Sequence, residues 1–219
     1  MKLNEYIDHT ALAANATDEE LQQLYEEARS YGFKSVCVEP SRVAEAHGAL
    51  SDSEVLVCTV IGFPLGQNTT EVKVFEAKNA IENGADELDM VLNVADLQAG
   101  RNDRVRNEIK KLKEVAGDRI LKVILEISFL SDEEIRRASL LAKEAGADFV
   151  KTSTGFSEHG ATVEAVALMR ETVGPEMGVK ASGGIRDYAT AKAMIEAGAS
   201  RIGASKSVAI MEGAGEVRS

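Results

Sequence analysis

Cysteine and histidine are scarce in this chain of 219 residues. The two cysteines, Cys37 and Cys58, lie in apolar, strand-like runs, which is typical of buried free thiols in a reducing cytoplasm rather than of a disulfide or a metal pair. The histidines, His9, His47 and His159, are scattered without metal-ligand spacing. We therefore expect a cytoplasmic protein without a structural metal.

Long apolar runs and linker-like segments are also lacking. No apolar run approaches the roughly 20 residues that a membrane-spanning helix needs, so no membrane partner is expected. A charge already stands at Lys2 with no apolar core behind it, so no signal peptide is expected. Only three prolines occur, and no segment is rich in serine and glycine. With 44% apolar residues to build a core, we expect one catalytic domain over residues 1–219.

Basic residues are outnumbered by acidic ones, and the formal net charge is −11. A surface of this sign repels phosphate backbones, so nucleic acid is excluded as the expected partner. An anionic small molecule would have to be held by local hydrogen-bond donors, because the overall field of the protein opposes it.

What the sequence does contain is a weak helix–strand repeat. Four helix-like stretches end in glycine and lead directly into a strand-like run. These glycines are Gly32, Gly84, Gly146 and Gly198. Glycine accepts the left-handed conformation that ends a helix. Helix starts are equally clear, because residues 17–20 and 131–134 both have the sequence of a capping box.

Eight short apolar runs are candidate strands, and helical stretches separate most of them. They are residues 6–8, 35–38, 55–61, 87–91, 121–125, 149–152, 178–181 and 201–203. Apolar runs without clean alternation favour parallel strands that are covered on both sides. Alternating strands and helices predict an α/β fold, here a single-domain (β/α)8 TIM barrel. A doubly wound open sheet is the alternative, although no G-x-G-x-x-G motif follows an early strand.

Two lysines stand inside strand-like runs, just before loops of small residues. Lys151 precedes Thr-Ser-Thr-Gly, and Lys180 precedes Ala-Ser-Gly-Gly. Active sites of such barrels lie at the carboxyl ends of the strands, so neighbouring strands would bring both amines together in a dry interior. Repulsion and desolvation favour the neutral amine that a Schiff-base nucleophile requires. For one lysine alone, a reach to solvent or a simple ion pair would be the better interpretation.

Carboxylates also occupy inward strand positions. A period of two places Glu87 and Asp89 on one face of their strand. Asp89 could pair with the lysines and relay protons, whereas a structural ion pair is the favoured role for Glu87. Lys122 and Glu126, on the next strand, are expected to pair with each other and to steady the site.

Two small-residue loops follow the last two predicted strands. Residues 183–186 read Gly-Gly-Ile-Arg, and residues 203–206 read Gly-Ala-Ser-Lys. Loops at these places in a barrel often bind phosphate through free backbone N–H groups, and glycine lets the backbone approach closely. Ser205 offers a hydroxyl and Lys206 a charge, so a phosphorylated substrate is expected.

Six motifs together resemble one enzyme family. They lie at residues 7–10, 57–64, 68–73, 85–91, 149–156 (Phe-Val-Lys-Thr-Ser-Thr-Gly-Phe) and 179–186 (Val-Lys-Ala-Ser-Gly-Gly-Ile-Arg). The chain resembles the deoxyribose-phosphate aldolases from about Tyr6 to about Ile210, and the last two motifs together are highly specific. A small residue is commoner in that family at the position of Lys206.

The resemblance implies a class I aldolase that works without a metal or other cofactor. It would reversibly cleave the sugar phosphate 2-deoxy-D-ribose 5-phosphate to acetaldehyde and D-glyceraldehyde 3-phosphate. By resemblance, Lys151 forms the Schiff base, Lys180 favours its neutral form, and Asp89 relays protons. Further matches to substrate-binding positions are Asp8, Lys122, Gly155, Gly183, Gly184, Gly203 and Ser205.

Two other functions stay open at this point. One is another Schiff-base aldolase or transaldolase that acts on a longer sugar phosphate. The other is a barrel that binds a sugar phosphate without reacting, since fold alone does not choose among chemistries. Barrels of this size often pair, so a homo-oligomer, either a dimer or a tetramer, is compatible with the sequence.

Overall fold

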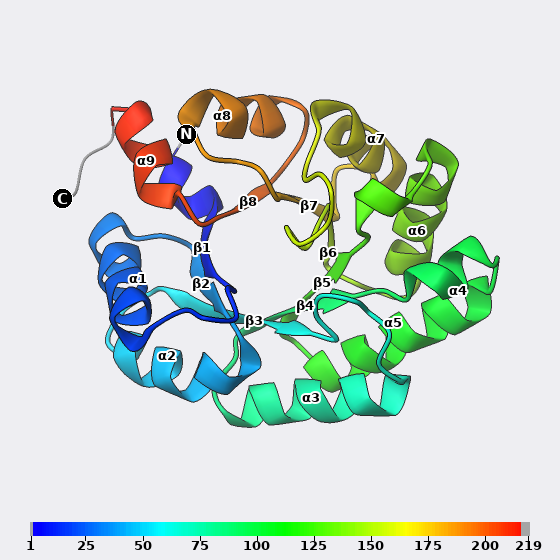
Figure 1. The fold of residues 1–219 in the computed structure, drawn as a ribbon. Helices are drawn as coiled ribbons and strands as arrows, with labels where there is room; N and C mark the ends of the chain where they lie inside the picture. The colour runs from blue at the N-terminus through cyan, green and yellow to red at the C-terminus, as the bar shows by residue number, and fades with distance from the viewer. Residues whose placement is uncertain (1, 216–219) are drawn as a thin grey trace.

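Eight parallel strands form a closed barrel in the computed structural model (Figure 1), which describes residues 2–215 and leaves Met1 and residues 216–219 outside the description. The strands are β1 (Ile7–Ala11), β2 (Ser35–Val38), β3 (Leu56–Ile61), β4 (Glu87–Val91), β5 (Ile120–Ile124), β6 (Phe149–Lys151), β7 (Gly178–Ser182) and β8 (Arg201–Ala204). Each strand pairs with its neighbours in sequence, and β8 pairs with β1. The predicted (β/α)8 TIM barrel is confirmed, and the open sheet is excluded.

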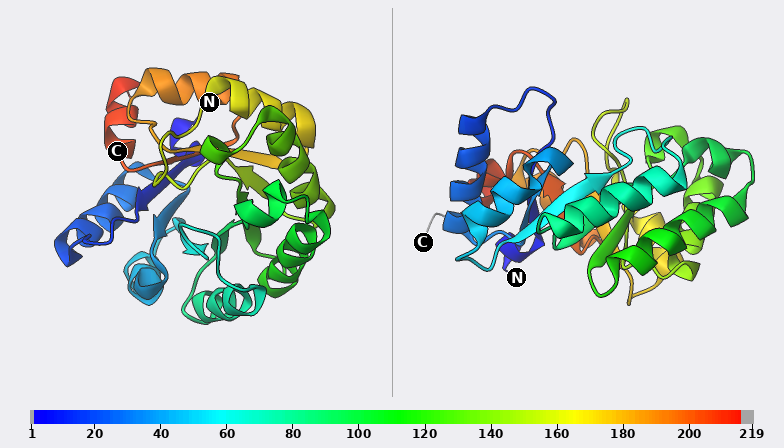
Figure 2. Two further views of the ribbon diagram at one scale, coloured as in Figure 1. Left: turned by 45° about the vertical axis from the view of Figure 1, so that its right-hand side comes forward. Right: turned by 90° about the horizontal axis from the view of Figure 1, so that it is seen from below.

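An outer ring of helices surrounds the strands (Figure 2). The α-helices are α1 (Asp18–Tyr31), α2 (Val43–Leu50), α3 (Thr70–Glu82), α4 (Val94–Gln98), α5 (Asn102–Ala116), α6 (Asp132–Glu144), α7 (Val163–Val173), α8 (Tyr188–Glu196) and α9 (Ser207–Gly213). Short 3-10 helices are η1 (Leu3–Tyr6), η2 (Pro40–Arg42) and η3 (Ile127–Phe129). None of the helices in the described residues combines the length and the apolar character that crossing a membrane requires.

Local sequence signals set the helix ends. Both capping boxes form: the hydroxyl of Thr17 accepts from the backbone of Glu20, and the hydroxyl of Ser131 accepts from that of Glu134. Gly32 ends α1 with φ 60° and ψ 45°, the left-handed conformation that glycine adopts at little cost.

Some strand boundaries differ from those predicted. β1 extends to Ala11, beyond the predicted end at residue 8, and β5 ends at Ile124 rather than at residue 125. Just beyond β5, Glu126 has a φ of 57°, which breaks the extended chain directly before η3.

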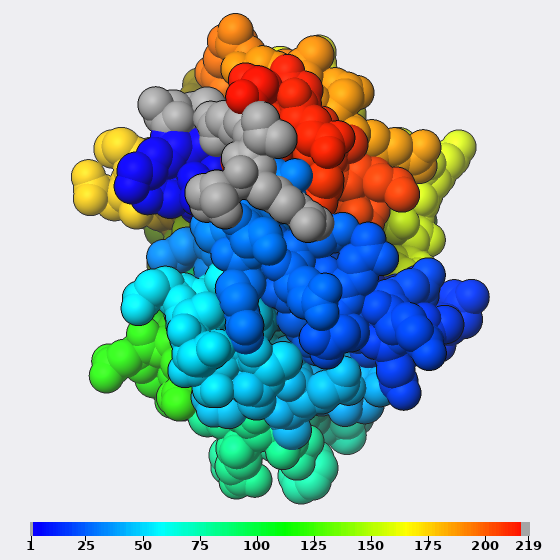
Figure 3. Space-filling view, turned by 90° about the vertical axis from the view of Figure 1, so that its left-hand side faces the viewer, coloured from blue at the N-terminus to red at the C-terminus, as the bar shows by residue number. Residues whose placement is uncertain are grey.

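The two faces of β4 pack in different environments. Leu88 and Met90 alternate along β4 with Glu87 and Asp89, and all four are buried. The apolar side chains belong to the hydrophobic core, together with buried residues of the surrounding helices. The acidic side chains form ion pairs with basic residues of other strands inside the barrel. Closure of β1 on β8 also brings the first and last helices to one side of the molecule, where Figure 3 shows α1 in blue and α9 in red.

Candidate active site

Seven charged side chains meet inside the barrel, and all are buried. This interior charge cluster consists of Asp8, Glu87, Asp89, Lys122, Lys151, Lys180 and Arg201. They come from strands β1, β4, β5, β6, β7 and β8. A buried charge is costly unless an oppositely charged group pairs with it. Here each side chain of the cluster finds that partner on another strand.

Asp89 lies at the centre of the cluster. Its Oδ2 accepts hydrogen bonds from the amines of Lys151 at 2.9 Å and Lys180 at 2.8 Å. Its Oδ1 accepts one from Lys122 at 2.8 Å. Burial raises the pKa of Asp89, but the three ammonium groups together lower it well below its ordinary value. Asp89 is therefore a carboxylate throughout the physiological range.

Lys151 and Lys180 are direct register partners on β6 and β7. Both amines reach the same oxygen of Asp89, which confirms that the two lysines meet inside the barrel. Burial lowers the pKa of Lys180, but Asp8, 2.5 Å away, and Asp89 raise it well above its ordinary value. These two ion pairs favour the cationic form of Lys180 beside Lys151.

Deeper in the barrel, Arg201 bridges two carboxylates. One of its guanidinium nitrogens donates to Asp8 at 2.7 Å and to Glu87 at 3.0 Å. Lys122 also pairs with Glu87, at 2.6 Å, which fits the structural role predicted for Glu87. Arg201 was not predicted from the sequence as a site residue, although a period of two with Gly203 places it inside the barrel.

The predicted pair between Lys122 and Glu126 does not form. Lys122 points into the interior charge cluster, whereas Glu126 follows β5 and accepts hydrogen bonds from the backbone N–H and the hydroxyl of Thr154. The turn at Glu126 is the physical reason, because it carries this side chain away from Lys122 and toward the loop after β6.

We expect Asp8→Asn to weaken the acid dependence of stability. Burial raises the pKa of Asp8, but Lys180 and Arg201 outweigh it and hold that pKa below the ordinary value of 3.8. The stabilisation is therefore complete above that pH and is lost as the pH falls toward the folded pKa. Urea unfolding at several pH values should show a smaller loss of unfolding free energy for the variant between about pH 5 and pH 2. Equal slopes for both proteins would contradict the ion pairing of Asp8.

A cavity of about 720 Å³ opens above the cluster at the carboxyl ends of the strands. Of the predicted site residues, those that line it are Lys151, Gly155, Gly183, Gly184, Gly203, Ser205 and Lys206. Lys151 is the member of the interior charge cluster in the cavity wall. Asp8, Asp89, Lys122 and Lys180 lie beneath and are fully buried, so direct substrate contact by Asp8 or Lys122 stays a prediction.

The sequence profile of the DeoC/LacD family aldolases matches residues 3–214. This chain belongs to that family. It is 59% identical over 213 residues to the deoxyribose-phosphate aldolase of Streptococcus gordonii, with 97% of both chains covered. The deoxyribose-phosphate aldolase of Staphylococcus carnosus is 55% identical over 213 residues, again with 97% of each chain covered.

Solved structures agree with this assignment. A deoxyribose phosphate aldolase from Aeropyrum pernix, described as a unique tetramer, superposes with a TM-score of 0.88 at 37% identity. The match covers 96% of this chain and 89% of the other. The resemblance inferred from the sequence motifs is confirmed.

Backbone packing fixes the glycine loops of this DeoC/LacD family aldolase. A Cβ atom at Gly160 would lie 2.0 Å from the carbonyl oxygen of Gly183, so the loops after β6 and β7 touch backbone to backbone. A Cβ atom at Gly203 would lie 3.0 Å from Cε of Lys180. Gly203 therefore leaves room for the Lys180 side chain to reach Asp89.

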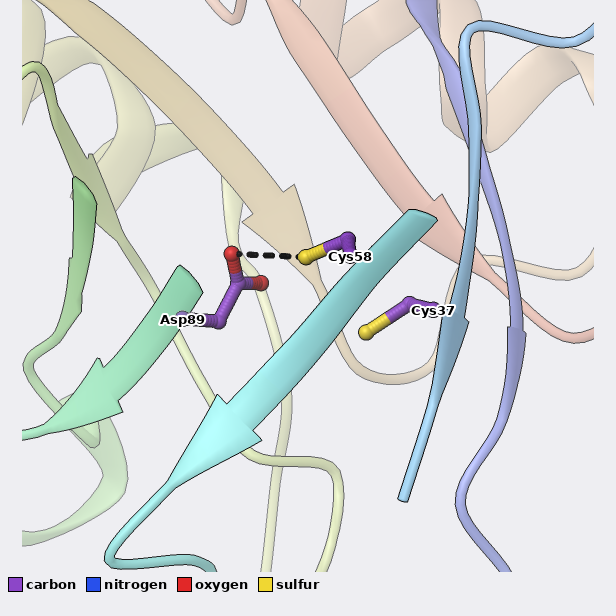
Figure 4. A group of neighbouring side chains, drawn as sticks. All are labelled: Cys37, Cys58 and Asp89. Atoms are coloured by element: carbon purple, nitrogen blue, oxygen red, sulfur yellow. Dashed lines mark hydrogen bonds between the residues drawn. The ribbon is translucent and has the colours of Figure 1, made fainter. Parts of the chain in front are cut away.

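The two cysteines of this aldolase face each other beside Asp89 (Figure 4). Cys37 and Cys58 are register partners on β2 and β3, and both are buried free thiols, as expected. Cys58 donates to Asp89 Oδ1 at 3.2 Å, and burial raises its pKa well above the ordinary value. Two sulfur atoms and a carboxylate could hold a soft metal ion. Asp89 already accepts hydrogen bonds from three lysine side chains, however, and the cations of Lys122 and Lys180 would repel a dication.

Proposed function

We propose that this protein reversibly cleaves 2-deoxy-D-ribose 5-phosphate to acetaldehyde and D-glyceraldehyde 3-phosphate through a Schiff base on Lys151. The observation that carries the proposal is the amine of Lys151 in the cavity wall, held 2.9 Å from Asp89 Oδ2 beside the cation of Lys180. Relatives that are named deoxyribose-phosphate aldolases and align over nearly the whole chain support the choice of substrate.

The interior charge cluster contains one more cationic group than it has carboxylates. Three carboxylates, Asp8, Glu87 and Asp89, stand against four cationic groups when every member is ionised. A buried excess charge is costly, so the cluster is more stable when one amine gives up its proton. Lys151 is the least tightly held of the four, because its amine meets a single carboxylate oxygen, which it shares with Lys180, and it is the one that lines the cavity.

The reaction then follows from this geometry. The neutral amine of Lys151 adds to the aldehyde carbon C1 of the open-chain sugar, and loss of water gives an iminium ion. A base takes the proton of the C3 hydroxyl, C3 becomes an aldehyde as the C2–C3 bond breaks, and the electron pair of that bond passes to the iminium to give an enamine. Glyceraldehyde 3-phosphate leaves, and protonation and hydrolysis of the remaining enamine release acetaldehyde and the free lysine. We assign the proton transfers to a water molecule held by Asp89 and Lys180.

The substrate phosphate would lie against the loops after β6, β7 and β8. The residues proposed to hold it are Gly155, Gly183, Gly184, Gly203 and Ser205, all of which line the cavity. Arg186 and Lys206 also line the cavity and provide local positive charge, which this acidic protein needs to hold an anion. Asp8 and Lys122 would act indirectly, by fixing Lys180 and Asp89.

An assay of 2-deoxy-D-ribose 5-phosphate cleavage tests the proposal, with glyceraldehyde 3-phosphate as the measured product. Turnover of longer ketose phosphates is measured in the same way, and a preference for them would indicate a transaldolase. Binding of the sugar phosphate without any turnover would indicate a non-catalytic barrel and would overturn the proposed activity.

We also propose a homo-oligomer, a dimer or a tetramer, in the cytoplasm. The tetrameric Aeropyrum pernix structure and the two unpaired thiols support this proposal. Val72 and Phe75 lie three positions apart on α3, and the Phe75 side chain is 71% exposed. Exposed apolar side chains of this size favour a contact with a second copy.

We expect Phe75→Glu to reduce the mass measured by light scattering, because it places a charge in the proposed contact. Phe129→Glu is the matched control, since Phe129 is also an exposed aromatic residue but belongs to η3. A mass that is unchanged by Phe75→Glu, or reduced equally by both substitutions, would contradict a contact through α3.

A further inference from the structure

His9, at the centre of β1, connects three elements that meet where the barrel closes. Its Nε2 lies 2.8 Å from Oε2 of Glu27 on α1, and its Nδ1 lies 2.9 Å from Oγ of Ser207, the first residue of α9. The His9 side chain is buried, and Ser207 is completely buried. These contacts hold the start of α9 against α1, on the face of the molecule shown in Figure 3.

The hydrogen-bond partners of His9 determine which of its ring nitrogens carries a proton. A carboxylate only accepts hydrogen bonds, so the Nε2 of His9 carries a proton and donates to Glu27. Burial lowers the pKa of His9, against the opposing effect of Glu27, so the ring is neutral near neutral pH. A neutral ring that donates from Nε2 can only accept at Nδ1, so the single proton of the Ser207 hydroxyl is shared between Nδ1, at 2.9 Å, and the carbonyl oxygen of Ala204, at 3.0 Å. The result is a directed chain from Ser207 through His9 to Glu27.

The same order of groups activates the nucleophile in serine hydrolases. Ser207 is completely buried, however, and it is not among the residues that line the cavity. No substrate carbon can reach its oxygen, so this chain of hydrogen bonds does not serve nucleophilic catalysis. The hydrogen bonds of Ser207 and His9 therefore have a structural role, in the part of the chain next to Ser207.

Ser207 directly follows the β8–α9 loop, which consists of Ser205 and Lys206. This loop, His9 and Glu27 all line the same cavity that Lys151 enters. The Oγ of Ser207 also lies 3.0 Å from the carbonyl oxygen of Ala204, the last residue of β8. Ser207 is therefore fixed both to the end of β8 and to His9, with the loop held between these two attachments.

We propose that His9, oriented by Glu27, is a positioning residue that holds the β8–α9 loop in place, through Ser207, for the phosphate group of the substrate. The proposal rests on the proposed function for the identity of the sugar phosphate. His9 does not touch the reacting carbon atoms. Its loss should therefore weaken binding of the phosphorylated substrate and leave the carbon–carbon bond chemistry intact.

We expect Ser207→Ala and His9→Asn each to raise KM for 2-deoxy-D-ribose 5-phosphate about tenfold, the usual scale for losing a buried hydrogen bond. The kcat should stay within about twofold, and kcat/KM for unphosphorylated 2-deoxy-D-ribose should not change. The double variant should be little worse than either single variant, because both substitutions break one connection. Glu27→Gln keeps an acceptor oxygen and should retain the wild-type KM, whereas Glu27→Ala should not.

Two matched controls separate this role from general destabilisation. Ser139→Ala removes an equally buried hydroxyl from α6, and His47→Asn removes an exposed histidine from α2. Neither should change KM. An equal rise of KM for both sugars, a fall of kcat alone, or no change in the His9 and Ser207 variants would overturn the proposal.

Calorimetry with inorganic phosphate keeps this test independent of the aldolase reaction. The dissociation constant of phosphate should rise in the His9 and Ser207 variants and stay constant in the controls. If the wild-type protein cleaves neither sugar but phosphate binding follows this pattern, the proposed function fails while the role of His9 stands. If the wild-type protein cleaves the sugar phosphate but phosphate binding is insensitive to both substitutions, the role of His9 fails alone.

Discussion

Lys151→Ala should abolish cleavage of 2-deoxy-D-ribose 5-phosphate, with a loss of roughly 10⁵-fold or more in kcat. The amine is the only proposed covalent attachment point, and neither Asp89 nor Lys180, which is held in ion pairs beneath the cavity, can replace it. A coupled assay for glyceraldehyde 3-phosphate measures the loss. Activity within about tenfold of the wild type would contradict the assignment of Lys151.

Lys151→Met is the control for folding in this experiment. It keeps most of the side-chain volume, and Asp89, which is the ionic partner of Lys151, still pairs with Lys122 and Lys180. We expect its melting temperature to equal or exceed that of the wild type, because no carboxylate loses its last partner. Lys192→Ala, on the surface of α8, should leave both activity and stability unchanged.

Asp89→Asn has the second largest expected effect, and it should reduce both stability and activity. The substitution leaves Lys122, Lys151 and Lys180 without the carboxylate that they share. Breaking a buried ion pair by removing one partner costs about 3–5 kcal/mol of unfolding free energy. Loss of the proton relay should lower kcat by about 10²- to 10⁴-fold. Urea unfolding and the cleavage assay measure the two effects separately.

Glu87→Gln is the matched control for Asp89→Asn. Glu87 is an equally buried carboxylate on the same strand, but it pairs with Lys122 and Arg201 and not with Lys151. We expect a similar loss of stability with kcat within about tenfold of the wild type. Equal losses of activity in both variants would show that Asp89 matters only for folding.

Much of the fold could be predicted because its signals are local. The capping boxes at Thr17 and Ser131 and the glycine at the end of α1 each require only a few neighbouring residues, and all three form as expected. Strand boundaries were less predictable where a single residue departs from the regular backbone. The left-handed φ of Glu126, which ends the extended chain after β5, has no sequence signature comparable to a glycine.

The ionic partners inside the barrel could be predicted only in part. A period of two places Asp89 and Lys180 in the interior, but the protonation of Lys180 depends on Asp8, which comes from the far end of the sequence. The facing thiols of Cys37 and Cys58 depend on the register between β2 and β3. Such registers follow from closure of the barrel, which no local pattern specifies.

Reductive trapping tests the Schiff base on Lys151 most directly. The wild-type protein is incubated with acetaldehyde and borohydride, digested, and its peptides are analysed by mass spectrometry. We predict one ethyl group on the peptide that contains Lys151 and no modification of Lys180, because Lys180 stays protonated. An adduct on Lys180, or an adduct that still forms in the Lys151→Ala variant, would contradict a neutral, reactive Lys151.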